Sequence, residues 1–153
     1  MMNPVIHQDY SLEKTYHIEA HGKIDKEFLI KRGKYLRIDN FISKYNFDLD
    51  HDLLNFEVNL LRSRRFLSAA TAQIHIVDMN LRIPTIVHAL IFGADRHNTG
   101  ILNLVFPHMP VRPRWLSKII CLEEGEGPNS RVLKLESFRK EFPPGTYFVG
   151  IKL

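Results

Sequence analysis

The stretch FEVNLLRSRRFLSAATAQIHIVDMNLRIPTIVHALIFG, residues 56–93, contains the longest apolar runs of the chain. Around its start, residues 53–60 alternate between apolar and polar side chains, and this period of two predicts a half-buried strand. Residues 66–77 begin with small side chains and continue with aliphatic ones, which favours a second strand. The tripeptide DMN at 78–80 is typical of a hairpin loop, because Asp and Asn tolerate turn conformations. Residues 82–93 are almost continuously apolar, so we expect a third strand with both faces covered.

Two different periods organise the N-terminal part of the chain. The segment LEKTYHIEAHGKI, residues 12–24, alternates with a period of two and predicts a strand that ends near its glycine. The segment GKYLRIDNFISKYNF, residues 33–47, has apolar residues at helical spacing, which predicts a helix from about 34 to 45. An alternative start for this helix lies upstream near Asp25, with Gly33 as a weak point.

The C-terminal part of the chain predicts shorter strands at 101–106, 118–123, 131–137 and 146–153. Together with the preceding segments they indicate an α+β domain. We expect a mainly antiparallel sheet of six to eight strands, packed with at least one helix at about 34–45.

The chain length of 153 residues is that of one domain. A chain of this size buries roughly two-thirds of the surface that its unfolded form exposes, which suffices for one hydrophobic core without disulfides. We therefore expect a single α+β domain over residues 11–153. Residues 1–10 are expected to be loose, as untethered chain ends usually are.

The composition argues against several classes of protein. No run reaches the roughly 18 apolar residues that a membrane-spanning helix needs. The N-terminal residues lack the basic start and apolar centre of a signal peptide. The single cysteine, Cys121, cannot form an internal disulfide, which fits a reducing compartment. The prediction is a cytoplasmic protein without membrane contact.

Three arginines, Arg62, Arg64 and Arg65, lie within four positions between the first two expected strands. The chain has 21 Lys and Arg against 17 Asp and Glu, and this net charge of +4 permits an anionic ligand without requiring one. The arginines could bind an anion, since a guanidinium group binds carboxylate or phosphate through two hydrogen bonds. Alternatively, they keep a strand bend solvated and protect a sheet edge against association.

His75 and His88 lie within the second and third expected strands. If those strands pair through the DMN turn, the two imidazoles could share a face and carry out acid–base chemistry near neutral pH. The alternative is that each histidine is structural. The two-histidine phosphoesterase pattern does not apply, because it requires Ser or Thr two positions after each histidine, where this chain has Val77 and Leu90.

Two clusters have the composition of a metal site. His17 and His21 flank Glu19, but four residues along a strand separate the two imidazoles by roughly 13 Å, which is too far for one ion. Residues 48–52, DLDHD, gather carboxylates but lack the glycine and the distal glutamate of a calcium-binding loop. A polar strand face and a turn explain the two clusters without an ion. We therefore expect no metal and no cofactor.

The stretch 56–93 resembles the sheet half of hotdog-fold acyl-thioesterases. In that family a strand runs into a bend containing Arg and Ser or Gly, followed by a strand of small and aliphatic residues, a tight turn and an apolar strand ending in FG. Here the bend is 62–65 and the final pair is Phe92–Gly93. The resemblance implies a dimeric acyl-thioester binder whose arginines meet the phosphates of coenzyme A. The family's catalytic acid or amide lies on or near a central helix, where this chain has Asp39 and Asn40, both outside any family motif.

Two functions are compatible with the sequence. One is the binding of a small acyl-thioester-like ligand, with thioesterase-like hydrolysis as the enzymatic form. The alternative is a basic module for nucleic acid or an acidic protein, formed by residues 31–44, 62–65 and 112–118. Aromatic side chains that lie among those charges and could stack on bases are Tyr35, Tyr45 and Trp115.

Overall fold

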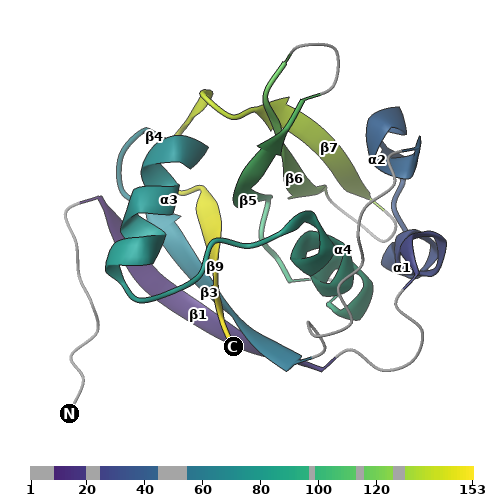
Figure 1. Ribbon diagram of the computed structural model, residues 1–153, viewed down its shortest axis with the longest axis horizontal. Helices are drawn as coiled ribbons and strands as arrows, with labels where there is room; N and C mark the ends of the chain where they lie inside the picture. The colour runs from purple at the N-terminus through teal and green to yellow at the C-terminus, as the bar shows by residue number, and fades with distance from the viewer. Residues whose placement is uncertain (1–8, 20–24, 45–54, 97–98, 113–115, 126–129) are drawn as a thin grey trace.

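The computed structural model describes residues 9–19, 25–44, 55–96, 99–112, 116–125 and 130–153 (Figure 1). The strands in these ranges are β1 (Tyr10–Glu19), β2 (Arg37–Ile38), β3 (Asn55–Ser63), β4 (Leu67–Ser68), β5 (Asn103–Val111), β6 (Lys118–Glu124), β7 (Arg131–Ser137), β8 (Glu141–Phe142) and β9 (Tyr147–Lys152). The helices are α1 (Lys26–Gly33), α2 (Asn40–Lys44), α3 (Ala69–Asp78) and α4 (Ile86–Asp95).

Seven strands form one mixed sheet in the order β1-β3-β9-β5-β6-β7-β2 (Figure 1). The pairs β9–β5 and β7–β2 are parallel, and the other four pairs are antiparallel. β4 and β8 form a separate antiparallel pair. The predicted α+β class with a mainly antiparallel sheet is therefore confirmed. The strands expected in the C-terminal part of the chain correspond to β5, β6, β7 and β9.

The strand expected over 66–77 is wrong, because after the short β4 these residues form helix α3. Ser68 caps this helix, and its side-chain oxygen accepts a hydrogen bond of 3.2 Å from the backbone N–H of Thr71. The small residues Ala69 and Ala72 are buried and let the helix lie close to the sheet. An apolar run by itself does not distinguish a strand from a packed helix, whereas the capping residue does.

The strand expected over 82–93 is also wrong, because most of these residues form helix α4. Thr85 and His88 make a capping box: the N–H of His88 donates to Thr85 Oγ1 at 3.3 Å, and the N–H of Thr85 donates to His88 Nδ1 at 2.8 Å. α4 is buried on all sides over residues 87–94, which explains why its sequence shows no polar stripe. The DMN residues end α3 instead of joining two strands, with Asn80 at a φ of 60°.

The helix expected over 34–45 is split into two. Helix α1 begins at Lys26, close to the alternative start, and ends at Gly33. Lys34 has left-handed backbone with a φ of 51°, so the helix cannot continue through it. The short strand β2 follows and pairs with β7 before α2 begins. This tertiary pairing overrides the helical spacing of the apolar residues.

Alternate residues of the central strands pack on opposite faces of the sheet. In β5, Leu104 and Phe106 belong to the core cluster under α4, whereas Val105 belongs to the cluster under α3. α4 and the neighbouring α1 cover one face, and α3 with the β4–β8 pair covers the other (Figure 1). The two helices that replaced the expected hairpin therefore lie on different sides of the sheet.

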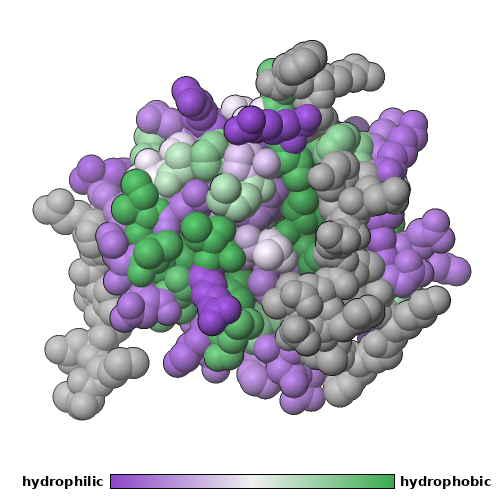
Figure 2. Space-filling model, viewed as in Figure 1, coloured by the Kyte–Doolittle hydropathy of each residue, from purple (hydrophilic) through white to green (hydrophobic). Residues whose placement is uncertain are grey.

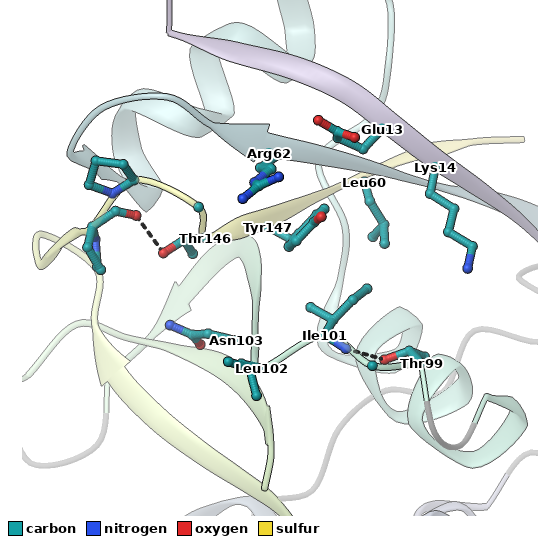
Figure 3. Close-up of a pocket in the computed structure, with 14 residues that line it drawn as sticks. Glu13, Lys14, Leu60, Arg62, Thr99, Ile101, Leu102, Asn103, Thr146 and Tyr147 are labelled. Atoms are coloured by element: carbon teal, nitrogen blue, oxygen red, sulfur yellow. Dashed lines mark hydrogen bonds between the residues drawn. The ribbon is translucent and has the colours of Figure 1, made fainter. Parts of the chain in front are cut away.

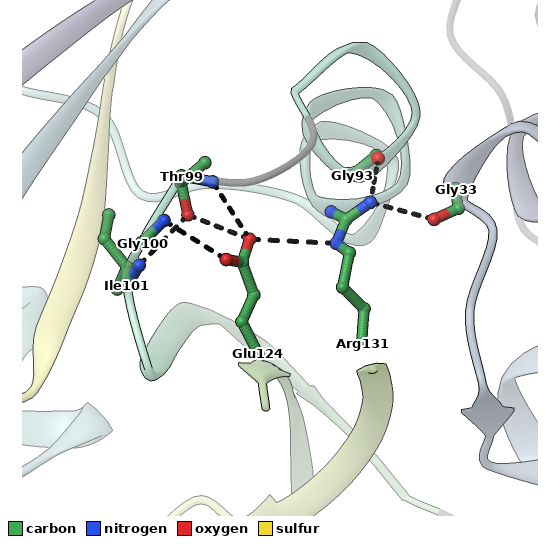
Figure 4. A network of polar contacts seen from close by, with 7 residues as sticks. All are labelled: Gly33, Gly93, Thr99, Gly100, Ile101, Glu124 and Arg131. Carbon is green, nitrogen blue, oxygen red and sulfur yellow. Dashed lines mark hydrogen bonds and ion pairs between the residues drawn. The ribbon is translucent and has the colours of Figure 1, made fainter. Parts of the chain in front are cut away.

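A buried arginine joins α1, α4 and the sheet (Figure 4). Arg131 begins β7, and its Nη1 donates to the carbonyl oxygens of Gly33 and Gly93, each at 2.8 Å. Both carbonyls lie in the last turn of a helix, where they lack an intrahelical partner and carry the negative end of the helix dipole. Nε of Arg131 lies 3.8 Å from Oε1 of Glu124. One side chain thus connects two helices to two strands.

Tyr35 fills the space between the ends of α1 and α4. A β-carbon at Gly33 would clash with the Tyr35 ring, and one at Gly93 would clash with its hydroxyl group. The guanidinium carbon of Arg131 lies 5.2 Å from the centroid of the Tyr35 ring. Burial raises the pKa of Tyr35 to about 12, so the phenol is neutral. Both glycines are therefore required by the packing of one aromatic side chain.

A buried histidine bridges a break in the ladder between β5 and β6, where the register shifts after Phe106. The backbone N–H of Ile120 donates to Nε2 of His108 at 2.9 Å. Nδ1 of the same ring then carries the proton and donates to the carbonyl oxygen of Met109 at 2.6 Å. Burial lowers the pKa of His108 to about 4.

His88 is neutral for the same physical reason. Its Nδ1 is occupied by the capping hydrogen bond, and its ring packs edge-on against Phe56 with centroids 4.7 Å apart. Burial lowers the pKa of His88 to about 4.

We expect the free energy of unfolding to fall as the pH decreases from 6.5 toward 4. The unfolded chain takes up a proton at each histidine near pH 6.5, whereas His88 and His108 in the folded chain take it up only near pH 4. The loss approaches roughly 3 kcal/mol per histidine at the acid end of this window. Urea unfolding between about pH 7 and 5 measures the onset of this loss. Most carboxyl groups titrate below this range, so they contribute little to the change.

The variant His108→Gln is the control for this prediction, because glutamine offers one donor and one acceptor but does not titrate. It should lose about half of the pH dependence that wild type shows above pH 5. A variant with the full wild-type pH dependence would contradict the assignment.

Candidate ligand-binding site

An open cavity of about 550 Å³ lies between the β1–β3–β9 part of the sheet and residues 99–103 (Figure 3). Its polar lining residues are Glu13, Lys14, Arg62, Thr99, Asn103, Thr146 and Tyr147. Its larger apolar lining residues are Leu60, Ile101, Leu102, Pro143 and Pro144. The cavity therefore offers both charged and apolar surface to a ligand.

The registers of the antiparallel strands bring one wall of this cavity together. Arg62 of β3 lies opposite Tyr147 of β9, and Leu60 of β3 lies opposite Lys14 of β1. Leu60 and Arg62 are two positions apart in one strand, so their side chains point to the same face. Strand pairing alone thus places a lysine, an arginine and a tyrosine at neighbouring positions, although they are far apart in sequence.

The charges of this wall are only partly neutralised. The guanidinium carbon of Arg62 lies 6.0 Å from the centroid of the Tyr147 ring, and Lys14 Nζ lies 4.7 Å from the centroid of the Tyr16 ring. Neither cation forms an ion pair with another residue in the described part of the chain. Glu13 is the acid in the lining and accepts a hydrogen bond from Ser11 Oγ at 3.0 Å. Two cations against one carboxylate leave the wall positive.

Glu124 fixes the opposite wall (Figure 4). Its carboxylate accepts hydrogen bonds from the N–H of Thr99 at 3.3 Å, from Thr99 Oγ1 at 2.9 Å and from the N–H of Gly100 at 3.2 Å. Gly100 has a φ of 76°, a conformation that favours glycine. Because Glu124 also contacts Arg131, this wall is linked to the arginine that holds α1 and α4.

The turn between β8 and β9 forms a third side of the cavity. The carbonyl oxygen of Pro143 accepts hydrogen bonds from Thr146 Oγ1 at 2.8 Å and from Ser63 Oγ at 3.3 Å. The N–H of Gly145 donates to the carbonyl oxygen of Ser63 at 2.8 Å, and Gly145 has a φ of 91°. These contacts tie the turn to the end of β3 and set its position beside Arg62.

The three predicted anion-binding arginines do not form one surface. Arg62 lines the cavity, whereas Arg64 and Arg65 follow the end of β3 and lie outside the lining. Arg65 pairs with Asp9. The exposed Arg64 forms no ion pair within the described residues. The prediction of an anion site at these residues is therefore carried by Arg62 alone.

The hairpin that would have brought His75 and His88 together does not form, and the two histidines lie on α3 and α4, on opposite faces of the sheet. His75 Nε2 lies 3.4 Å from Oδ2 of Asp9, and its ring centroid lies 4.8 Å from that of Tyr10. Asp9 and Tyr10 were expected to be loose but pack against α3 through these contacts, and residues 1–8 lie outside the described residues. Neither histidine lines the cavity.

Asp39 has a structural place at the start of α2, where its Oδ1 accepts a hydrogen bond of 2.8 Å from the N–H of Phe41. It borders a second cavity of about 510 Å³ between α2 and the β6–β7 region. Lys44 and Lys118 also line this second cavity, so it is basic as well. Asp39 does not line the cavity that contains Arg62.

The described residues contain no group of three or more His, Cys, Asp and Glu side chains that could hold a metal ion. His17 and Glu19 form a pair with 3.9 Å between Nε2 and Oε1. His21 and residues 48–52, the other parts of the two candidate clusters, lie outside the described residues.

Sequence reasoning missed Lys14, Thr99 and Tyr147 as site residues. Each belongs to a segment with ordinary strand or loop composition, and only the strand order brings them to the same cavity. The sequence PPGT at 143–146 is typical of a turn. Nothing in it shows that this turn lies beside Arg62.

Comparison with protein-family models, with curated proteins and with solved structures found no match for this chain. None of the helices in the described part of the chain has the length and apolar character that crossing a membrane requires.

The variant Glu124→Gln is expected to loosen the cavity wall at Thr99 and Gly100. It weakens hydrogen bonds to a charged acceptor and leaves buried Arg131 without its carboxylate, so we expect a loss of about 1–3 kcal/mol in stability. Hydrogen exchange of the Thr99 and Gly100 amides should accelerate more than that of β6 amides. The matched control Glu123→Gln removes a more exposed ion pair with Lys134, which should cost less than about 1 kcal/mol. Equal effects of the two substitutions would contradict the role of Glu124.

Proposed function

We propose that this protein binds a small anionic ligand with an apolar part in the cavity beside Arg62. The observation that carries the proposal is the position of the Arg62 guanidinium group in a concave wall, against Tyr147 and without an ion-pair partner among the described residues. Such an arginine can donate two parallel hydrogen bonds to a carboxylate or a phosphate. Small-molecule sites are concave and combine apolar surface with polar groups that fix the orientation of the ligand.

The apolar side of the cavity indicates the second half of the ligand. Ile101 and Leu102 lie across the cavity from Arg62 and Tyr147 (Figure 3). The Leu102 residue is 72% exposed, so a ligand that covers it removes apolar surface from water. A ligand with an anionic head near Arg62 and an aliphatic part near Leu102 fits both walls.

Coenzyme A thioesters are the first ligand class to test, because they combine phosphate groups with an acyl chain. The resemblance of the 56–93 stretch to hotdog-fold acyl-thioesterases implies the same class, but it adds no support, because two of the strands on which it rests are helices in the structure. The proposal does not depend on a hotdog fold, since residues 69–78 and 86–95 of that stretch form α3 and α4.

The proposed activity is binding rather than hydrolysis. The described residues that line the cavity include no serine, cysteine or histidine. The Thr146 hydroxyl donates to the carbonyl of Pro143. The Thr99 hydroxyl donates to the Glu124 carboxylate, which also accepts from two backbone N–H groups and lies beside Arg131, so that its contacts are those of a loop anchor. The catalytic candidates His75, His88 and Asp39 lie outside this lining.

A second candidate function is the binding of nucleic acid or an acidic protein at the second cavity. Lys44 of α2 and Lys118 of β6 come from two of the basic segments noted in the sequence, and both line this cavity together with Phe41. Cations beside an aromatic ring can bind a phosphate and stack on a base. Binding of this kind would weaken strongly as salt increases.

The test is a titration of the purified protein with coenzyme A, octanoyl-coenzyme A, octanoate and a single-stranded oligonucleotide. Arg62→Met should weaken binding of the acyl ligands by about tenfold or more, because a charged hydrogen bond contributes roughly 1.5–3 kcal/mol. Arg64→Met is the matched control, since it removes an exposed arginine two positions away that lies outside the cavity. The affinity of the Arg64→Met variant for the acyl ligands should stay close to that of wild type.

Equal affinities of the Arg62→Met and Arg64→Met variants would contradict the proposal. Oligonucleotide binding that weakens with salt and with Lys44→Met, in the absence of acyl-ligand binding, would assign the function to the second cavity instead.

A further inference from the structure

The cavity beside Arg62 has a cation at each end. Arg62 of β3 and Lys14 of β1 both line it, and neither forms an ion pair within the described residues. In Figure 3, Lys14 extends toward the right of the view and Arg62 lies further left, with Leu60 and Tyr147 between them. The two charged side chains therefore diverge along one wall of the cavity.

The strand register sets the spacing of these two cations. Lys14 lies opposite Leu60, and Arg62 follows Leu60 by two positions in β3, so Arg62 and Lys14 are diagonal neighbours in the antiparallel pair. Diagonal neighbours in such a pair are roughly 7–8 Å apart at the backbone. Because the two side chains diverge from these positions, a ligand that contacts both needs two separate anionic groups.

An irregularity in β1 brings the lysine to this position. The register shifts between Leu12, which lies opposite Leu61, and Lys14, which lies opposite Leu60. Regular pairing would place Glu13 opposite Leu60 instead, so the bulge exchanges a carboxylate for an ammonium group. β-bulges occur often beside active sites, where they re-aim a side chain. Protection of the free sheet edge does not require the exchange, because a charged glutamate would also protect that edge.

Two carboxylates on this side of the molecule have other partners. Glu13 accepts a hydrogen bond of 3.0 Å from a serine hydroxyl group, and Oδ2 of Asp95 lies 3.3 Å from Nε of Arg96. Nζ of Lys14 and the guanidinium carbon of Arg96 lie 4.7 Å and 5.5 Å from the centroid of the same ring, that of Tyr16. An anionic group of a ligand therefore meets Lys14 without displacing an ion pair.

The groups between the two cations are suited to an aliphatic chain. Leu60 and the ring of Tyr147 lie on the wall that the cations share, and Ile101 and Leu102 lie on the facing wall (Figure 3). The Leu102 side chain is largely exposed, and a chain that covers it removes apolar surface from water. Figure 2 shows the surface of the whole molecule from the side seen in Figure 1, where apolar and charged groups lie next to each other in the same way.

We propose that the ligand of this cavity carries an anionic group at each end of an aliphatic segment, with one group at Arg62 and the second at Lys14. The ligand class rests on the binding function proposed above. It comprises medium-chain dicarboxylates and coenzyme A thioesters whose acyl chain ends in a carboxylate, which share an anion, an apolar chain and a second anion. A simple fatty acid would leave Lys14 without an anionic partner.

Titrations of the full chain with octanoate and octanedioate test the proposal, because these acids have the same chain length and differ in the second carboxylate. Octanedioate should bind wild type more tightly. Lys14→Met should lower the ratio of the two affinities by about threefold, since a partly exposed ion pair contributes at most about fivefold, and should leave octanoate binding unchanged. The matched control Lys152→Met changes another exposed lysine, on β9 and outside the lining, and should leave the ratio unchanged.

The same titrations with octanoyl-coenzyme A and octanedioyl-coenzyme A show which form the cavity takes. A preference that depends on Lys14 only among the thioesters assigns the coenzyme A form. The same preference only among the free acids assigns the free dicarboxylate.

Failure of the two-anion ligand is distinguishable from failure of the binding function. If Arg62→Met weakens binding but Lys14→Met leaves the affinity ratio unchanged in both ligand pairs, the second anionic group is ruled out and the binding function stands. If none of the four ligands binds, both are overturned. Butanedioate has two carboxylates but is too short to span the two cations. Binding of butanedioate as tight as that of octanedioate would show an effect of charge alone and would also overturn the proposal.

Discussion

The buried guanidinium group of Arg131 is the constraint on which the arrangement of the elements depends. A buried charge is stable only with polar partners, and those of Arg131 come from separate segments: the final carbonyls of α1 and α4, and the carboxylate of Glu124. Tyr35 fills the space beside it and requires glycine on both helices. Because Glu124 also holds residues 99–101, the contacts that fix two helices on the sheet fix one wall of the cavity as well.

The sequence predicted the fold where alternation was clear and failed where apolar runs were continuous. β6 and β7 lie within one residue of the strands expected at 118–123 and 131–137. The two long apolar runs were read as strands because neither shows a polar stripe, but each begins at a capping residue, Ser68 or Thr85, that indicates a helix. The apolar character of α4 reflects the burial of residues 87–94, and that of α3 comes in part from Ala69, Ala72 and Ile76, which pack on the sheet. Periodicity alone cannot separate these cases from a buried strand.

The candidate site was predictable only in part. Arginines at a strand bend do mark the cavity, but the end of β3 after Ser63 separates Arg62 from Arg64 and Arg65. Lys14 and Tyr147 reach the same wall through strand pairing, which no local pattern reveals. Histidines in apolar segments proved to be structural where their environment is buried, as the capping bond of His88 shows. Composition therefore indicated a candidate anion site, and topology decided which residues line the cavity.

The proposed ligand lies between Arg62 and the cavity wall that Glu124 holds. The most direct test of this position is to follow the backbone amide signals by NMR while octanoyl-coenzyme A is added to the protein. We expect the amides of Gly100, Leu102 and Gly145 to shift together in one saturating transition. The proposed position would be contradicted if these amides stay unchanged, or if the shifts are confined to α2 and the start of β6 around the second cavity.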